Sequence, residues 1–404
     1  MRTLILSDLH LGSYSDTDVL RRQELREPLL AVAAEAERVV LLGDVLELRH
    51  GPMRDALAAS RPFFEDLGRA LAGREIVVVA GNHDHALIDP WLRARGQVHE
   101  PPPLGPEQLL APEQASSAYA LIAQWCSPAR LRVAYPGLWV RPDVYATHGH
   151  YLDCHLTVPT LERLSMGVMA RVLGRRPSTF DCVDNYESTG SPAFAWRDAV
   201  ARDAHTGNAL NGIATVNAWR ALGGARRPRE RPDRRSSRSA RLRMSGASRE
   251  LRRRAMVAGF PLAVAALNRA GIGPLRADIS HTELRRAGLR AMAEVSARLG
   301  FENSYVVFGH THRTGPLPGD DEREWSGAAG VRLFNAGSWT YSSIFLTATP
   351  GESPYWPGGC VVVADSGPPQ VRMLLSHSTH EQLMRPLSFS GARQDGASAP
   401  PAAR

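Results

Sequence analysis

The chain has 404 residues, of which 43% are hydrophobic and 22% charged, an ordinary composition for a protein that buries a substantial core. The net charge of +7 is local: residues 226–254 hold 13 arginines and three acids, so a nucleic-acid-binding surface over the whole fold is not indicated. The four cysteines form no CxxC pair and show no repeated spacing, so neither a disulfide framework nor a zinc ribbon is indicated.

The N-terminal part of the chain alternates short apolar runs with helical periodicity. It starts without the charged and long apolar segments of a secretory signal, so a cytoplasmic protein is expected. We predict buried strands and helices that alternate, the strands at 2–6, 38–42 and 75–80 and the helices at 16–36 and 62–71. Such alternation is typical of an α/β fold with a mainly parallel sheet, whose ligands gather beyond the carboxyl ends of the strands.

Further short strands are predicted over 131–147, with turns at Pro136-Gly137 and Pro142-Asp143. Later apolar runs predict strands at 304–308, 331–334, 360–364 and 371–375. Between these two groups the pattern is mostly helical, with helices predicted at 159–173, 193–204, 214–222, 250–270 and 281–299.

The helical segment connects two loops that carry candidate site residues. We therefore predict that residues 151–299 form an insertion that caps a domain made of residues 1–150 and 300–385. Within the insertion, residues 225–248 are rich in Arg, Pro and Ser, and we predict that they are disordered. The tail, residues 386–404, is also predicted to be disordered.

Five clusters of metal-binding residue types follow the predicted strands. They are Asp8-Leu9-His10, Gly43-Asp44, Gly81-Asn82-His83-Asp84, His148-Gly149-His150 and Gly309-His310-Thr311-His312. Each cluster alone is more often a turn or a surface pair, but the five together in this order favour a shared site. Residues i and i+2 of an extended segment point to the same side, so Asp8 with His10, and His310 with His312, can each serve one centre. Carboxylate, imidazole and amide ligands suit Mn²⁺, Fe or Zn²⁺.

These clusters, in this order, resemble the calcineurin-like metallophosphoesterase family. The matching residues are Asp8-x-His10, Gly43-Asp44-x-x-Glu47, Gly81-Asn82-His83-Asp84, His148, Gly309-His310-x-His312 and Asn335-x-Gly337-Ser338. The resemblance covers about residues 1–150 and 300–375 and leaves out the basic segment and the tail. It implies an α/β fold, a four-layer α/β/β/α sandwich, to which the chain adds its large helical insertion.

The resemblance also implies roles for single residues. Asp8, His10 and His312 would hold one divalent ion, Asn82, His148 and His310 a second, and Asp44 would bridge the two. His83 would contact the substrate phosphate, and Asp84 would orient its ring. The implied reaction is hydrolysis of a phosphate ester or pyrophosphate by a metal-bridging hydroxide, with Mn²⁺ the first expectation and Fe or Zn²⁺ the alternatives.

The substrate remains open at this point. One branch of the family, the UDP-2,3-diacylglucosamine pyrophosphohydrolases, holds acyl chains with a helical insertion, and the start Ser7-Asp8-Leu9-His10-Leu11 is similar to that branch. The chain departs from it in having His83 where the branch commonly has arginine, and in its longer insertion. A nucleotide-diphosphate or lipid-linked substrate is one expectation, with peripheral membrane or lipid contact through the insertion.

Two other interpretations compete with this one. A nuclease or cyclic-nucleotide phosphodiesterase would suit the same metals, and the Arg-rich segment could hold a polyanion, although no aromatic–basic alternation accompanies it. A non-catalytic metal-binding scaffold would predict the loss of a ligand or of His83, and none is missing. Around the site, Glu47 is predicted to support the loop after Asp44, and His150 to form hydrogen bonds.

Overall fold

The computed structural model describes residues 2–13, 17–176, 179–203, 259–342, 346, 349 and 351–384. Several regions about which the sequence makes predictions lie outside the described residues: the Arg-rich stretch 225–248, the helix at 214–222, the first part (250–258) of the helix at 250–270, and the tail 386–404. Among the described residues, no helix combines the length and the apolarity needed to cross a bilayer.

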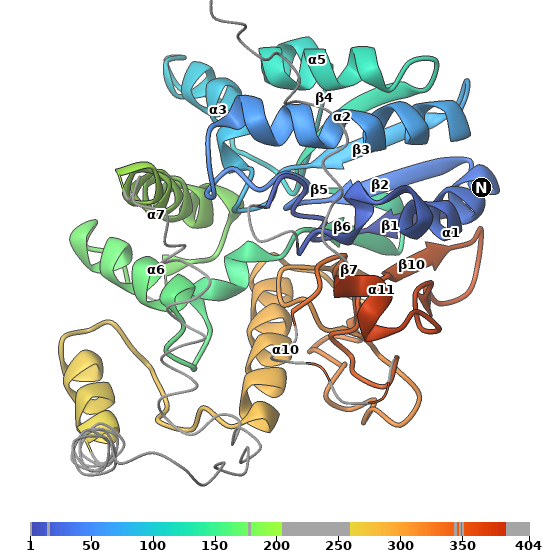
Figure 1. Cartoon of the computed structure of the whole chain (residues 1–404). Coiled ribbons are helices and arrows are strands. Elements are labelled where there is room, and N and C mark those ends of the chain that lie inside the picture. The colour runs from blue at the N-terminus through green and yellow to red at the C-terminus, as the bar shows by residue number, and fades with distance from the viewer. Residues whose placement is uncertain are drawn as a thin grey trace, which may run out of the picture.

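One mixed sheet forms the centre of the molecule (Figure 1). Its described strands are β1 (Thr3–Leu6), β2 (Arg38–Leu42), β3 (Glu75–Val79), β4 (Glu107–Leu110), β5 (Arg130–Arg141), β6 (Val144–Thr147), β7 (Tyr305–Phe308), β8 (Thr314–Gly315), β9 (Arg332–Ala336), β10 (Gly359–Val363) and β11 (Gln370–Met373). They lie in the order β11-β10-β1-β2-β3-β5-β6-β7-β9-β8, with β4 on β5. Parallel pairing joins β1 to β2, β2 to β3 and β3 to β5, and again β6 to β7 and β7 to β9. The predicted α/β class is confirmed.

Helices cover the sheet. They are α1 (Gln23–Ala34), α2 (Met53–Ala70), α3 (Asp89–Gly96), α4 (Pro112–Ala115), α5 (Ser117–Trp125), α6 (Leu161–Val172), α7 (Val183–Asp203), α10 (His281–Arg298) and α11 (His380–Met384), with short 3₁₀ helices η1 (Val19–Arg21), η2 (His85–Leu87) and η3 (His150–Cys154). In α2, Phe63, Phe64 and Leu67 are fully buried, and their three- and four-residue spacing turns one helix face toward the core. The sequence predicted only the second half of this helix.

Alternate residues of the strands enter two separate cores. Ile5, Val40 and Val77 belong to a cluster that contains only strand residues and their immediate neighbours. Leu4 and Val39, one position earlier on β1 and β2, belong to the larger cluster, which includes the buried faces of α1, α2 and α5. The strands are therefore apolar on both faces, as a covered parallel sheet requires. The described strands all belong to one hydrogen-bonded sheet, in which β4 pairs only with β5, and the expected four-layer division stays a prediction.

Strand β5 corrects one expectation. Pro136 and Gly137 were predicted to form a turn, but the strand continues through both residues to Arg141. Pro136 lies opposite Glu107 of β4, at the position where the register between the two strands shifts. A residue without an N–H group is tolerated at such an irregularity, so the strand does not end there.

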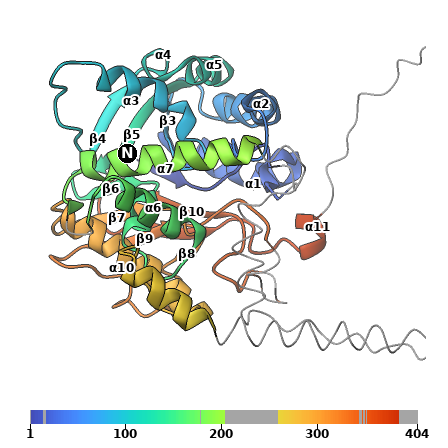
Figure 2. The ribbon, with the colours of Figure 1, turned by 90° about the vertical axis from the view of Figure 1, so that its left-hand side faces the viewer.

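The long helical segment connects β6 and β7, which are neighbours and parallel in the sheet. Its helices α6 and α7 lie side by side, and α7 also contacts η2 and η3, which follow β3 and β6 (Figures 1 and 2). Residues 259–269 are helical, in agreement with the later part of the helix predicted at 250–270. The segment thus reaches the loops at the carboxyl ends of two central strands.

Candidate metal centre

The predicted ligands all follow the carboxyl ends of strands. Asp8 and His10 come after β1, Asp44 after β2, Asn82 and His83 after β3, His148 after β6, and His310 and His312 after β7. The strands β1, β2 and β3 are parallel to one another, and so are β6 and β7, so each group collects its own loops at one edge. The two groups run in opposite directions because β5 and β6 are antiparallel, yet their loops meet: Asp44 contacts His148, and Asp8 contacts His312. Three groups of His and Asp side chains there have ligand atoms close enough to hold a metal ion.

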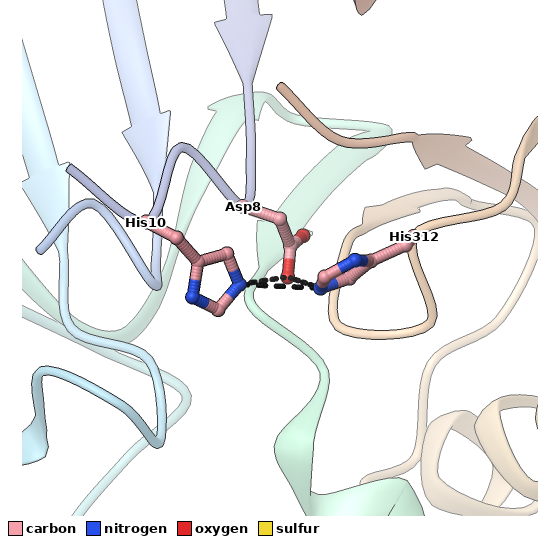
Figure 3. Close-up of side chains that lie close together, drawn as sticks. All are labelled: Asp8, His10 and His312. Carbon is pink, nitrogen blue, oxygen red and sulfur yellow. Dashed lines mark hydrogen bonds and ion pairs between the residues drawn. The ribbon is translucent and has the colours of Figure 1, made fainter. Parts of the chain in front are cut away.

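Asp8, His10 and His312 form the first group (Figure 3). The Nε2 atoms of the two histidines lie 3.2 Å apart, and Oδ1 of Asp8 lies 3.1 Å from Nε2 of His312. The other carboxylate oxygen of Asp8 is already used, since it accepts hydrogen bonds from Ser7 Oγ at 2.6 Å and His310 N at 2.8 Å. Three ligand atoms therefore converge on one point, an arrangement that suits a cation.

Asp44, His148 and His310 form the second group. Nδ1 of His148 lies 3.0 Å from the carbonyl oxygen of Leu42, which can accept its proton, so Nε2 is the atom turned inward. This Nε2 lies 3.4 Å from Oδ2 of Asp44 and 3.1 Å from Oδ1 of Asn82. When Nδ1 of His148 carries the proton, its Nε2 atom is an acceptor that faces two more acceptors, Oδ2 of Asp44 and Oδ1 of Asn82. A cation bound among these three atoms would satisfy all of them.

Asp44 connects the two groups. It also belongs to the third group, with His10 and His83, and its Oδ2 lies 3.7 Å from Nε2 of His10. Its second oxygen accepts a hydrogen bond from the backbone N–H of His83 at 2.7 Å, which fixes the carboxylate plane. One buried carboxylate is therefore within reach of both the His10 side and the His148 side of the centre.

The buried charges of the centre are matched to one another. Burial alone would raise the pKa of Asp44, but His148 and His83 outweigh it and hold that pKa well below its usual value. Burial likewise opposes the charge of His148, yet Asp44 raises its pKa to about 9. The Asp44 carboxylate is thus kept ionised, and His148 carries compensating positive charge that a metal ion would replace.

The backbone of the centre is unusual. Eight described residues other than glycine have a positive φ, and five of them are candidate ligands: Asp8, His10, Asp44, His310 and His312. Such conformations cost of order 1–3 kcal/mol each and collect at functional sites. The ligands therefore do not continue the extended strand, so the strand geometry from which their side-chain directions were inferred does not apply.

The structure corrects the pairing of the last cluster. His310 and His312 were expected from their spacing to serve one centre, but they fall into different groups. His310 lies with Asp44 and His148, and His312 lies with Asp8 and His10, which is the division that the family resemblance implies.

Asp84 does not orient the His83 ring. Its carboxylate accepts backbone hydrogen bonds from Val45 at 2.7 Å, Leu46 at 3.2 Å and Gly81 at 2.6 Å, so it joins the loops after β2 and β3. Burial and the charge of Asp44 raise its pKa to about 6. The expected orienting role was wrong because both oxygens of the Asp84 carboxylate already accept hydrogen bonds from backbone N–H groups of two tight loops.

Glu47 contacts the His83 ring instead. Its carboxylate lies 2.9 Å from Nδ1 of His83 and 3.0 Å from Nδ1 of His10. Both rings can donate these protons, which leaves each Nε2 free for the centre. Glu47 therefore does more than support the loop after Asp44, as the sequence suggested.

Three further residues near the centre carry no signal in the sequence. Asp153, in η3, is buried and lies 3.0 Å from Nε2 of His310. Arg49 and Arg197 are also buried, and Arg49 donates to the backbone carbonyl of Asn82. His150 was expected to form hydrogen bonds, but neither of its ring nitrogens has a partner among the described residues, and it packs against the rings of neighbouring side chains.

The N-terminal part of the chain, which carries most of the candidate ligands, matches a known family. The family model of the calcineurin-like phosphoesterases matches residues 1–174. The matched segment contains β1 to β6 and every candidate ligand except His310 and His312. Those two histidines are joined to the centre by the structure, through Asp8 and Asp153.

Proposed function

Since the model of the calcineurin-like phosphoesterase family matches residues 1–174, we propose that the chain hydrolyses a phosphate ester or pyrophosphate with a centre of two divalent metal ions. The observation that carries the proposal is Asp44, a buried carboxylate shared by two groups of metal-binding side chains. The family match supports a metal-dependent phosphoesterase, and the second ion is the step that we add.

The proposed ligands follow from the two groups. Asp8, His10 and His312 would hold one ion, Asn82, His148 and His310 the other, and Asp44 would contact both. Divalent ions in such sites make hydroxide available near neutral pH and stabilise negative charge on phosphate oxygens. We propose Mn²⁺ first because the ligands are oxygen and imidazole nitrogen without thiolate, a set that also suits Fe and Zn²⁺.

His83 is the residue proposed to contact the substrate phosphoryl group. Its side chain is 21% exposed, whereas the neighbouring carboxylates of Asp44 and Glu47 are almost fully buried. Burial and the nearby Arg49 lower its pKa to about 4, so the ring is neutral near pH 7. Since Nδ1 faces Glu47, Nε2 is the atom that can face the substrate and take part in proton movement there.

The reaction class is tested by Mn²⁺-dependent hydrolysis of bis(p-nitrophenyl) phosphate by the purified chain. Asp44→Asn removes the shared charge, and we expect it to lower the rate by a factor of about 10² or more. Asp143→Asn, an exposed acid paired with Arg141, is the matched control and should keep the wild-type rate. An Asp44→Asn rate within about threefold of wild type would refute the proposal. Metal binding without turnover of any ester would favour the scaffold interpretation.

A further inference from the structure

Two buried arginines stand between the loop after β2 and the helical segment. Arg49 follows Asp44 on that loop, and Arg197 lies on α7; their side chains are 0% and 3% exposed. Nε of Arg49 lies 3.1 Å from Asp198 of α7, and Nη2 of Arg197 lies 2.8 Å from Glu162 of α6. Each guanidinium is therefore held in position from one side by an acid.

The other sides of both guanidinium groups lack acceptors. Nη1 of Arg49 and both Nε and Nη1 of Arg197 are buried and have no hydrogen-bond partner among the described residues. A buried donor without a partner is unfavourable, and arginine cannot relieve it by losing its proton. Burial and the charge of Arg49 both lower the pKa of Arg197, so the two cations also oppose each other. Such an arrangement favours an anion with several acceptor oxygens.

This pair adjoins the metal centre. Nη2 of Arg49 donates to the backbone carbonyl of Asn82, next to His83. On the other side, the charge of Asp153, which contacts His310, raises the pKa of Arg197. The two guanidinium groups therefore adjoin the centre, Arg49 at the loop after β3 and Arg197 on the side where Asp153 contacts His310.

We propose that Arg49 and Arg197 form a subsite that binds a phosphoryl oxyanion of the substrate beside the metal centre. The planar guanidinium group matches the spacing of two phosphate oxygens, and two of them can hold one tetrahedral oxyanion from different sides. Because Arg197 belongs to α7, the subsite is complete only when the helical segment packs on the domain core. The proposal rests on the proposed phosphoesterase function, and it makes the two arginines determinants of substrate binding.

Sulfate, a tetrahedral dianion, tests the subsite without metals and without turnover. Thermal stabilisation of the metal-free chain by sulfate, at constant ionic strength, gives an apparent Kd. We expect Arg197→Gln and Arg49→Gln each to raise this Kd about tenfold or more, a loss of about 1.4 kcal/mol of binding free energy for each factor of ten. Arg197→Lys should fall in between, because it keeps the charge and loses the planar fork.

Arg26→Gln is the matched control. Arg26 is also buried and pairs with Asp66 at 3.1 Å, and one of its nitrogens, Nε, has no partner among the described residues. It lies on α1, whereas Arg49 and Arg197 lie on the loop after β2 and on α7. It should leave sulfate binding unchanged. Since arginine keeps its proton, wild-type sulfate binding should be nearly constant from pH 6 to pH 8.5. The subsite is overturned by any of three results: wild type does not bind sulfate, both Gln variants bind it as tightly as wild type, or sulfate binding disappears as pH rises.

Kinetics with the Mn²⁺-loaded chain then identify which phosphoryl group is bound. If it is the group under attack, Arg197→Gln should lower kcat/KM for bis(p-nitrophenyl) phosphate about tenfold or more. If the bound group is instead the neighbouring phosphoryl group of a pyrophosphate, Arg197→Gln should keep the wild-type kcat/KM for bis(p-nitrophenyl) phosphate. In that case inhibition of the variant by methylenediphosphonate should be about tenfold weaker, while inhibition by phosphate stays unchanged. If Arg197→Gln changes neither kcat/KM nor the inhibition by methylenediphosphonate, the proposal is overturned. Failure of the proposed function would appear as absent turnover with sulfate binding intact, so the two failures are distinguishable.

Discussion

Gly81, at the end of β3, provides a sharp test of the geometry around Asp44. A Cβ atom added at Gly81 would lie within 3.0 Å of three atoms of Asp44, two of them in the carboxyl group, and ordinary van der Waals contact begins at 3.4 Å. The φ of Gly81 is outside the left-handed region, so an alanine there is opposed by space alone. Asp44 cannot move freely, because one oxygen accepts the His83 N–H at 2.7 Å.

We therefore expect Gly81→Ala to displace the Asp44 carboxylate by about 1 Å, a misplacement that costs roughly 10² in rate. Overpacking should also cost about 1–3 kcal/mol of stability. The assay is kcat/KM for bis(p-nitrophenyl) phosphate over a range of Mn²⁺ concentrations, together with the melting temperature.

Gly96→Ala is the matched control for this variant. An added Cβ at Gly96, the last residue of α3, meets nothing within 4 Å, and its φ is also outside the left-handed region. This variant should keep the rate of wild type and have a melting temperature at least as high, because alanine is more favourable than glycine in a helix. A Gly81→Ala chain with wild-type activity and stability would show that Asp44 is not held where the structure puts it, or that its position does not matter.

Three other expectations follow from the same contacts. Despite burial, hydrogen bonds such as that from His85 lower the pKa of Glu187 from 4.5 to about 2. The ionised carboxylate therefore contributes roughly 3 kcal/mol of stability above about pH 4.5, and this contribution is lost as pH falls toward 2. In urea unfolding, Glu187→Gln should lose less stability than wild type across that pH range, and an equal loss would contradict this. Glu47→Gln loosens His10 and His83 and should weaken Mn²⁺ binding about 10–100-fold in a metal titration; unchanged affinity would contradict the positioning role. Removing metal with EDTA should lower the melting temperature, because ions bind the folded chain, and equal melting with and without Mn²⁺ would contradict binding at the centre.

The sequence predicts those parts of the fold that depend on local patterns. The apolar run 38–42 was predicted as a strand with the same limits as β2, because charged and glycine residues bound it on both sides. The candidate ligands could be identified because each follows such a run. In contrast, β4 was missed: its residues, Glu107–Leu110, alternate weakly, and β4 forms only by pairing at the side of β5.

Contacts between distant segments explain what the sequence could not predict. Arg49 and Arg197 are separated by nearly 150 positions, and only the packing of α7 on the loops after β2 and β3 brings them together. Adjacent residues in a tight loop also point to different sides, which is why Glu47 rather than Asp84 contacts the His83 ring. Sequence spacing cannot assign such partners, because the backbone at Asp44 has left the extended conformation.

The most direct test of a two-ion centre is anomalous diffraction at the manganese edge from crystals of the Mn²⁺-loaded chain. We predict two peaks about 3.5–4 Å apart, with the Asp44 carboxylate between them. One peak should lie among Asp8, His10 and His312, and the other among His148 and His310. A single peak, or peaks remote from Asp44, would contradict a two-ion centre that shares Asp44.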